Sequence, residues 1–566
     1  MNTLILNSNS CEKLLDSSWV KESGNHLNSR YLKLEGFAIL DRVELNEQSV
    51  YEIYKRDELS QINGQFSFLI LNYKTKSLIV ITDRFSSQPI YYYHSKTSII
   101  LSKNIFEIIK KSSNLRSSIS KENLFEFIYL QRLLGHKTLS NKIHRFQSAT
   151  RTTLSLGQDL KTSRYWFPSA KKTDLQFESA AKELARLISN SYNLYTNRFE
   201  KVGLLLSGGL DSRAVLGASS DKVKCYTLGP FKNNEYQVAK KLAAIKKLPI
   251  EFIKRDDRLY YDKRHESVRL GSGAQNIFHS HFYSLKKLSE IPEIFIHGHG
   301  FDYFFQGSYM PQDRVYFAGK STLHHRLKPI SDIANLFLKT LKYRLKYKEL
   351  MPLIPNSQTL LSSLKQEVQR VLKDSKDLDL ENPYDQWEYL NSHDLGSHYT
   401  ALNLHTINTC AKQRCLAWEN DLYDFYWSIP ASWRLDAKLF KKALLFLNRD
   451  LASYQNANIN LPAHWPTKLQ SIFYFAGQLL NKMGFKRFGL PSENERSWPN
   501  FKKLLSEDER WRKEVFSLQD GQIVKIGLVC PLRLKKLIES FYASPSDQAP
   551  LLYTLLTLEY ALSEIL

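Results

Sequence analysis

Residues 207–212 read SGGLDS and come directly after the apolar run VGLLL. An uninterrupted apolar run predicts a strand that is buried on both faces. Two glycines after such a strand let the backbone approach a ligand with no Cβ in the way. The amide groups at the start of a following helix attract an anion such as phosphate. The residues expected to contact phosphates are Ser207, Gly208, Gly209 and Ser212. Asp211 can hold the Mg²⁺ that usually accompanies phosphates.

A second glycine-rich stretch that contains an acid, GHGFD at residues 298–302, follows another strand-like run, EIFIH. Ligands of an open α/β sheet bind at the carboxyl ends of its strands. We therefore expect Gly298 and Gly300 to approach the same ligand as the first loop. Asp302 and Asp211 would then share one Mg²⁺.

Strand-like and helix-like segments alternate around these two loops. KVGLLLS, KVKCYTLG, PIEFIKR and EIFIHGHG are strand-like, and helical patterns separate the first three. This alternation predicts a doubly wound parallel sheet. The pattern becomes mainly helical from about residue 315, whereas residues 30–110 contain short, β-branched or aromatic strands. Pro168 and a polar stretch after it suggest a linker, with one domain over 1–168 and a second over 175–566.

Charge and cysteine usage narrow the class of protein. The chain has 566 residues and a formal net charge of +22, and residues 320–349 hold eight Lys or Arg against two acids. Such a region could bind an anionic partner or a membrane surface, or it could be an ordinary solvated helix face. No nucleic-acid signature accompanies the charge. Five cysteines without CxxC spacing argue against a disulfide framework and a zinc site. With no signal peptide or long apolar run, we expect a cytoplasmic protein.

The SGGLDS loop matches SGGxDS, the signature of the ATP-pyrophosphatase (PP-loop) family, and lacks the lysine of GxxxxGK[ST] loops. With its second loop, the chain resembles the asparagine synthetase family almost end to end. The resemblance implies an α/β PP-loop domain that binds ATP and Mg²⁺ and cuts ATP between the α and β phosphates. It also places Glu235 before a family helix, and Arg414 and Glu419 in a segment usually read R-x-P-F-L-D-x-x-L.

Two further roles are implied by the same resemblance. KLFKKALL resembles a K-x-x-L-R segment, so Lys441, with Lys442 as the alternative, would stabilise the charged adenylate and pyrophosphate. His299 stands where asparagine synthetases have an acid and β-lactam synthetases a tyrosine that helps to deprotonate the attacking amine. A histidine can do this near neutral pH, or it can be structural. Tyr303 replaces the acid that commonly follows the aspartate, which puts ordinary aspartate amidation in doubt.

The N-terminal part resembles the family's glutaminase domain, an α+β Ntn-hydrolase-like sandwich. NGQFSFLILNYKTKSLIVITDRFSSQPIYYY follows its pattern of G-x-F-x-F, a strand and D-R-x-G-x-x-P-L-Y-Y. That domain needs a cysteine as its mature N-terminal residue, because the cysteine's own amine serves as base. Residue 2 is Asn2, Cys11 would need an added cleavage, and no N-G-E segment follows. We therefore expect a domain without glutaminase activity.

These observations predict an ATP-dependent amide ligase that activates a small-molecule or peptide carboxylate as an acyl-adenylate for attack by an amine. Intramolecular cyclases of the β-lactam synthetase and lasso-peptide cyclase type lack the N-terminal cysteine too. An enzyme that amidates a glycan or another metabolite is a second form of the same hypothesis. Glutamine-dependent asparagine synthesis and a catalytically silent scaffold protein remain as alternatives.

Overall fold

The structure is a computed structural model. It describes residues 3–7, 25–27, 30–169, 171–376, 378–392, 395–398, 400–482, 497–545 and 547–566. Asn2 and Cys11 lie outside the described residues. No helix in the described part combines the length and the apolar character needed to cross a bilayer.

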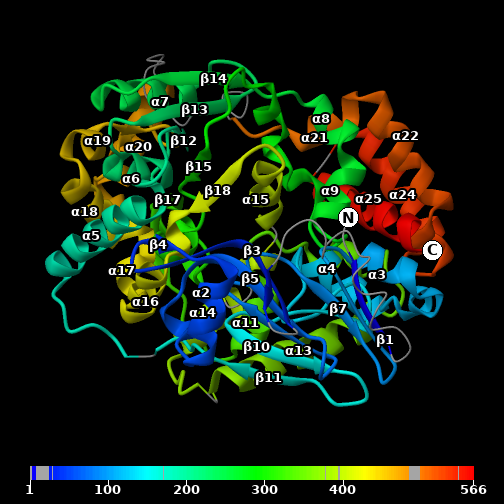
Figure 1. Ribbon diagram of the computed structural model, residues 1–566. Coiled ribbons are helices and arrows are strands. Elements are labelled where there is room, and N and C mark those ends of the chain that lie inside the picture. The colour runs from blue at the N-terminus through cyan, green and yellow to red at the C-terminus, as the bar shows by residue number, and fades with distance from the viewer. Residues whose placement is uncertain are drawn as a thin grey trace.

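Two antiparallel sheets stack in the N-terminal part (Figure 1). The smaller sheet has the order β1 (Thr3–Asn7), β8 (Ser98–Ser102), β7 (Tyr91–His94), β9 (Ile143–Arg145). The larger has the order β11 (Lys161–Arg164), β10 (Thr150–Ser155), β6 (Ser77–Thr82), β5 (Asn63–Asn72), β3 (Arg30–Leu40), β2 (Asn25–Leu27), and β4 (Val43–Glu44) pairs with β3. The sequence prediction of short strands over 30–110 is thus confirmed.

Strand β5 explains why this sandwich forms. It contains eight consecutive buried residues, Gly64–Leu71, because both of its faces are covered. Leu69 and Leu71 pack toward the smaller sheet, while Phe66 and Phe68 pack against helix α2 (Glu47–Lys55). The period of two along a strand assigns alternate side chains to the two cores.

A five-stranded sheet forms the centre of the second part. Its order is β14 (Ile250–Lys254), β13 (Val223–Gly229), β12 (Val202–Leu205), β15 (Ile294–His297), β18 (Lys412–Cys415). All four pairings are parallel, as the alternating pattern predicts. The helices between the first strands are α6 (Asp211–Ala218) and α7 (Asn234–Ile245), with α5 (Phe177–Thr196) before them. Strands β12 and β15 are neighbours, so their carboxyl ends lie at the same edge of the sheet.

The prediction that the chain is helical from about 315 is wrong at its start. A hairpin of β16 (Gln312–Phe317) and β17 (Lys320–Leu327) occupies this segment. Ala318 and Gly319 turn the chain with positive φ angles of 48° and 75°, which a helix cannot contain. Helices dominate only from α11 (Ile333–Thr340) onward. The basic region 320–349 therefore spans a strand, α11 and the short α12 (Tyr347–Leu350) rather than one helix face.

The remaining described helices of six or more residues in this part pack around the sheet, against the N-terminal part or against one another. They are α9 (Arg264–Leu270), α13 (Ser357–Lys376), α14 (Pro383–Ser392), α15 (Ala401–Asn408), α16 (Asn420–Ser428), α18 (Lys438–Leu447), α20 (Thr467–Lys482), α21 (Phe501–Glu507), α22 (Glu509–Ser517), α24 (Pro531–Ala543) and α25 (Ala549–Ile565). In Figure 1 the last helices, in orange and red, lie beside the N-terminal sandwich rather than beside β14.

The two parts meet through buried polar contacts. The Gln65 side chain accepts a hydrogen bond from the Cys415 amide at 3.1 Å, and the Asn63 side chain accepts one from the Asn420 amide at 2.8 Å. The Arg414 guanidinium lies 3.5 Å from the centre of the Phe37 ring. Because these contacts satisfy buried groups on β18 and at the start of α16, the N-terminal sandwich supports the synthetase-like sheet structurally.

Candidate active site

The loop after β12 is closed by its own two serines. The Ser207 amide donates to the Ser212 hydroxyl at 2.9 Å, and that hydroxyl donates to the Ser207 carbonyl at 3.1 Å. A Cβ on Gly208 would lie 2.3 Å from the Ala457 Cβ, so packing already requires this glycine. A Cβ on Gly209 would meet only the Ser207 hydroxyl oxygen, at 3.4 Å. Gly209 therefore leaves open the face on which a phosphate would lie.

The loop after β15 lies directly against the first loop. A Cβ on Gly298 would be 2.4 Å from the Asp211 carbonyl carbon and 2.6 Å from the Ser212 amide nitrogen. Gly300 has a φ of 96°, which favours glycine and reverses the chain into the short helix α10 (Phe301–Phe304). This close approach brings the two predicted loops to one place, as the sequence analysis expected.

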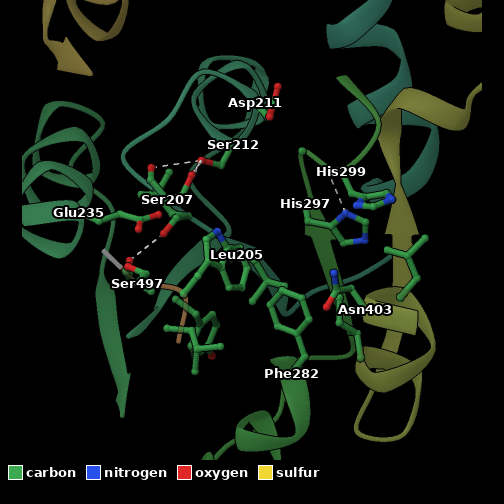
Figure 2. Close-up of a pocket in the computed structure, with 18 of the residues that line it drawn as sticks. Leu205, Ser207, Asp211, Ser212, Glu235, Phe282, His297, His299, Asn403 and Ser497 are labelled. Carbon is green, nitrogen blue, oxygen red and sulfur yellow. Dashed lines mark hydrogen bonds between the residues drawn. The ribbon is translucent and has the colours of Figure 1, made fainter. Parts of the chain in front are cut away.

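A pocket of about 240 Å³ opens between these loops (Figure 2). Its described lining comes from β12, β13 and β15, from helices α6, α7, α10 and α15, and from nearby loops. The lining residues are Leu205, Leu206, Ser207, Asp211, Ser212, Tyr226, Thr227, Leu228, Glu235, Phe282, His297, Gly298, His299, Asp302, Asn403, Leu404, Ile407, Ser497 and Trp498. In Figure 2, Ser207 and Glu235 lie on one side of the pocket, opposite His297, His299 and Asn403.

Asp211 and Asp302 form a pair of interacting carboxylates in the pocket wall. Burial raises the pKa of Asp211 well above its usual value, and the charge of Asp302 raises it further. The Gln306 amide donates a hydrogen bond to Asp211, and burial likewise raises the pKa of Asp302. Two hard oxygen donors side by side, next to a loop with an open glycine face, fit Mg²⁺, which takes one or two carboxylates and completes its shell with phosphate and water.

His299 lines the pocket, but its environment differs from the expectation of a base that titrates near neutral pH. Burial, with the nearby His297 and His279, lowers the pKa of His299 to about 3. Its backbone amide donates to the His297 Nδ1 at 3.3 Å, and its Nε2 lies 3.5 Å from the Thr400 hydroxyl. The imidazole is therefore neutral at pH 7. It can accept a hydrogen bond from an amine, but it is a weaker base than the sequence analysis assumed.

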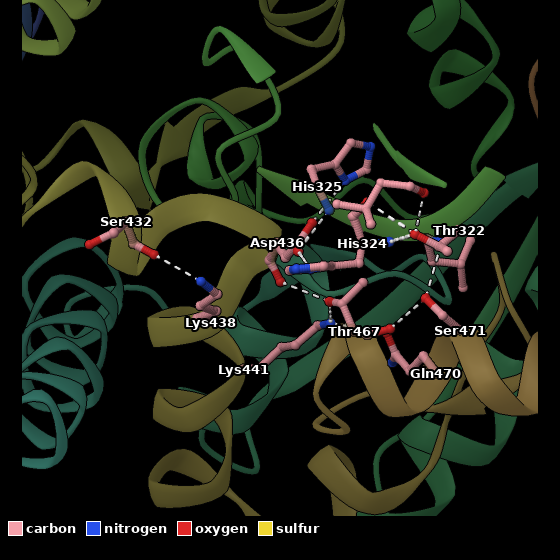
Figure 3. Close-up of polar contacts among 12 residues, drawn as sticks. Thr322, His324, His325, Ser432, Asp436, Lys438, Lys441, Thr467, Gln470 and Ser471 are labelled. Carbon is pink, nitrogen blue, oxygen red and sulfur yellow. Dashed lines mark hydrogen bonds and ion pairs between the residues drawn. The ribbon is translucent and has the colours of Figure 1, made fainter. Parts of the chain in front are cut away.

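Lys441 does not line the pocket among the described residues. Its ammonium donates to the Thr467 hydroxyl at 2.8 Å and to the Gln470 carbonyl oxygen at 3.0 Å, which ties α18 to α20 (Figure 3). Burial lowers the pKa of Lys441 to about 8. The alternative, Lys442, pairs with Glu178 at 2.9 Å. Both ammonium groups thus have protein partners outside the described pocket lining, and a direct phosphate role for Lys441 or Lys442 stays a prediction.

Four residues to which the sequence analysis assigned no role contact or influence the site in the structure. Gln306 and Tyr309, just beyond the GHGFD loop, both hydrogen-bond the acid pair. Thr400 reaches His299 from a segment far along the chain. Lys342 interacts electrostatically with both Asp211 and Asp302. Its only sequence signal was membership of the basic region 320–349.

The family resemblance also singled out Glu235, Arg414 and Glu419, and of these only Glu235 lines the pocket. The Glu235 carboxylate accepts hydrogen bonds from the Gly208 amide and from Ser497, at the edge of the pocket. Arg414 is buried at the contact with the N-terminal sandwich rather than in the pocket. The Glu419 side chain caps α16 by accepting from the Leu422 amide at 3.1 Å.

Comparison with known proteins agrees with this architecture. A glutamine amidotransferase domain model matches residues 48–166, and an asparagine synthase model matches residues 183–445. Asparagine synthetase [glutamine-hydrolyzing] 1 of Bacillus subtilis is 24% identical over 35% of this chain and 32% of its own length. Putative asparagine synthetase [glutamine-hydrolyzing] 2 of Methanocaldococcus jannaschii is 22% identical over 56% of this chain and 66% of its own. The matches therefore span from a third to just under two thirds of these relatives.

Among solved structures, a glutamine phosphoribosylpyrophosphate amidotransferase from B. subtilis matches with a TM-score of 0.16 and 10% identity, over 42% of this chain and 48% of that one. A score this low carries no structural argument. The two family models, in contrast, match the two parts of the structure: the first covers most of the N-terminal sandwich, and the second covers the parallel sheet. The second model covers both loops that meet at Gly298 and Asp211. The chain belongs to the asparagine synthetase family.

Proposed function

We propose that this protein is an ATP-dependent carbon–nitrogen ligase with a PP-loop synthetase domain. The observation that carries the proposal is the contact of the SGGLDS and GHGFD loops, which places Asp211 and Asp302 in one pocket wall beside the open face of Gly209. Asp211 and Asp302 would hold Mg²⁺, which neutralises charge on the transferring phosphate. Ser207, Gly209 and Ser212 would bind the phosphates.

The reaction has two steps. A substrate carboxylate oxygen attacks the α-phosphorus of ATP, and the bond to the bridging oxygen breaks, so pyrophosphate leaves with the electron pair. An amine nitrogen then attacks the acyl carbon, the carbon–oxygen bond breaks, AMP leaves, and the amide forms. The imidazole of His299, which lines the pocket, would accept the amine proton during this second step.

Glutamine-dependent asparagine synthesis is the second candidate, because both curated relatives carry that name. Two sequence features favour the broader ligase over it. Asn2 takes the place of the nucleophilic cysteine, and Tyr303 takes the place of the acid that commonly follows the aspartate. The Tyr303 ring is buried, and its hydroxyl bonds His398 and Thr400, so it serves the protein's own packing. Under this proposal the N-terminal sandwich is a scaffold without glutaminase activity.

Hydroxylamine trapping tests the proposal without knowledge of the natural amine. Hydroxylamine attacks acyl-adenylates and gives hydroxamates that are easily detected. The protein would be incubated with ATP, Mg²⁺, hydroxylamine and, separately, each amino acid and a set of short peptides and uronic acids. We expect at least one carboxylate to give a hydroxamate together with AMP. If aspartate were the only acid to give a hydroxamate, and if ammonia or glutamine then served as the nitrogen donor, asparagine synthesis would be favoured instead.

A further inference from the structure

We propose that Lys342 is the cationic residue that stabilises the departing pyrophosphate, the task that the family resemblance assigns to Lys441. The inference rests on the proposed function and assigns one residue to its first step. Lys342 lies in the connection between α11 and α12, far in sequence from both ligand loops.

Cation–π contacts hold the Lys342 ammonium against two tyrosine rings, one of which belongs to a residue that hydrogen-bonds Asp302. The Lys342 Nζ lies 4.6 Å from the centre of the Tyr309 ring and 5.3 Å from that of Tyr343. The Tyr309 ring in turn lies 4.4 Å from the Tyr303 ring, and Tyr303 follows Asp302 directly. The Tyr309 side chain also hydrogen-bonds Asp302. A lysine over an aromatic face is attracted to the ring while its ammonium keeps free donors for a ligand.

The charges agree with this placement. Burial raises the pKa of both Asp211 and Asp302, and the ammonium of Lys342 partly opposes this rise, so it lies within electrostatic reach of each carboxylate. The Lys342 side chain is nevertheless exposed to solvent. Burial around its ammonium lowers the pKa of Lys342, so the charged end faces the protein while the rest of the side chain is accessible. Its ammonium is a compact charge on a flexible stem, which can turn toward a polyphosphate.

Three other cationic side chains could be suggested for this role from the family resemblance or from their position, but each already binds protein groups. Lys441 donates to Thr467 and Gln470, and Lys442 pairs with Glu178. Arg213, on α6, is fully buried and its terminal nitrogens donate to four backbone carbonyls, those of Gly208, Leu451, Tyr454 and Gln455. Recruiting Lys441 or Arg213 to a phosphate would leave buried acceptors unpaired, at a cost in stability. Recruiting Lys442 would break its ion pair with Glu178.

The chemical need for such a cation is clear. When the bond from the α-phosphorus to the bridging oxygen breaks, the electron pair remains on the β-phosphate of pyrophosphate. When Asp211 and Asp302 are ionised to hold a metal ion, their charges repel the pyrophosphate unless cations balance them. A Mg²⁺ held by the two acids would balance part of this charge, and a positioned ammonium would balance more. Removing one such stabilising group typically costs about 10²–10³-fold in rate.

The test compares Lys342→Met and Lys342→Arg with the control Lys348→Met. Lys348 is another exposed lysine of the basic region, on α12. Two readouts are used with the full-length protein: ATP–pyrophosphate exchange with an acid found by hydroxylamine trapping, and titration calorimetry of magnesium pyrophosphate. We expect Lys342→Met to exchange about 10²-fold more slowly and to bind pyrophosphate at least tenfold more weakly. Lys342→Arg should retain most of the exchange rate and of the affinity for pyrophosphate, and Lys348→Met should match the wild type in both measurements.

The two readouts separate the two proposals. If the wild type shows no exchange with any carboxylate, the ligase proposal fails, while weaker pyrophosphate binding by Lys342→Met alone would still support Lys342. If Lys342→Met equals Lys348→Met in pyrophosphate binding, the assignment of Lys342 is overturned. A loss in Lys342→Arg as large as that in Lys342→Met would also overturn it, since charge would then not be the cause.

Discussion

Gly298 lies against Asp211 so closely that a Cβ on the glycine would be 2.4 Å from the aspartate's carbonyl carbon and 2.6 Å from its Cβ. Two loops that are far apart in sequence are thereby packed into one surface. The contact holds Asp211 at the edge where the GHGFD loop supplies Asp302. The spacing of the acid pair thus depends on a residue that carries no functional group.

Gly298→Ala should separate the loops, whereas Gly209→Ala should not. The first variant inserts a methyl group into backbone, which cannot move cheaply, so we expect the free energy of unfolding to fall by about 1–3 kcal/mol. Adenylate formation should fall by more than about 10²-fold, because the misplaced acids no longer meet one ligand. Gly209→Ala should unfold at the wild-type temperature yet bind ATP more weakly. Calorimetric unfolding measures the stability of each variant, and nucleotide titration measures its ATP binding. Equal unfolding temperatures for the wild type, Gly298→Ala and Gly209→Ala would contradict this account.

Asp211→Asn and Asp302→Asn should each slow adenylate formation by roughly 10³-fold, since each removes a ligand of the shared Mg²⁺. Groups that act as a unit are non-additive, so the double variant should be little worse than either single one. Removing one of two buried like charges should not lower the unfolding temperature. Pyrophosphate release in single turnovers measures the rates. Losses that multiply, or wild-type activity in Asp302→Asn, would place Asp302 in a structural turn.

Glu419 should make the protein less stable as pH rises. Burial, aided by the charge of Asp421, raises the pKa of Glu419 from 4.5 to about 7. A raised carboxyl pKa favours the protonated folded state, so this stability is fully present below pH 4.5 and lost as pH rises through 7. Glu419→Gln lacks the titration and keeps an oxygen to accept from Leu422. Its stability relative to wild type should therefore improve by up to about 3 kcal/mol from pH 5 to pH 8. Denaturant titrations at both pH values test this; a constant difference would refute the raised pKa.

Glutamine should not be hydrolysed. Asn2 stands where the nucleophilic cysteine is needed, so the purified protein should release no glutamate from glutamine. The control is Cys11→Ala, because cleavage before residue 11 would expose that cysteine as an N-terminal nucleophile. Glutamate release that disappears in Cys11→Ala would show that such processing occurs and that the N-terminal domain is active.

The sequence was most informative where function depends on consecutive residues. The SGGLDS and GHGFD loops, and the strands before them, were predictable because glycine spacing and apolar runs are local signals. Lys441 was chosen from a local KK pattern, but α18 packs so that its ammonium meets Thr467 and Gln470 on α20. Lys342 could not be distinguished from seven other basic residues of region 320–349. Only tertiary packing brings the Tyr309 ring beneath it. The same limit hid the β16–β17 hairpin, whose Ala318–Gly319 turn has no strong pattern around it.

The most direct test of the central claim is the position at which ATP is cut. The protein would be incubated with Mg²⁺, hydroxylamine and an accepted carboxylate, with ATP labelled at the α-phosphate in one reaction and at the γ-phosphate in another. The account predicts that the α label appears in AMP and the γ label in pyrophosphate, in amounts equal to the hydroxamate formed. Stoichiometric ADP and orthophosphate would contradict it, because they would mean that ATP is cut between its β and γ phosphates.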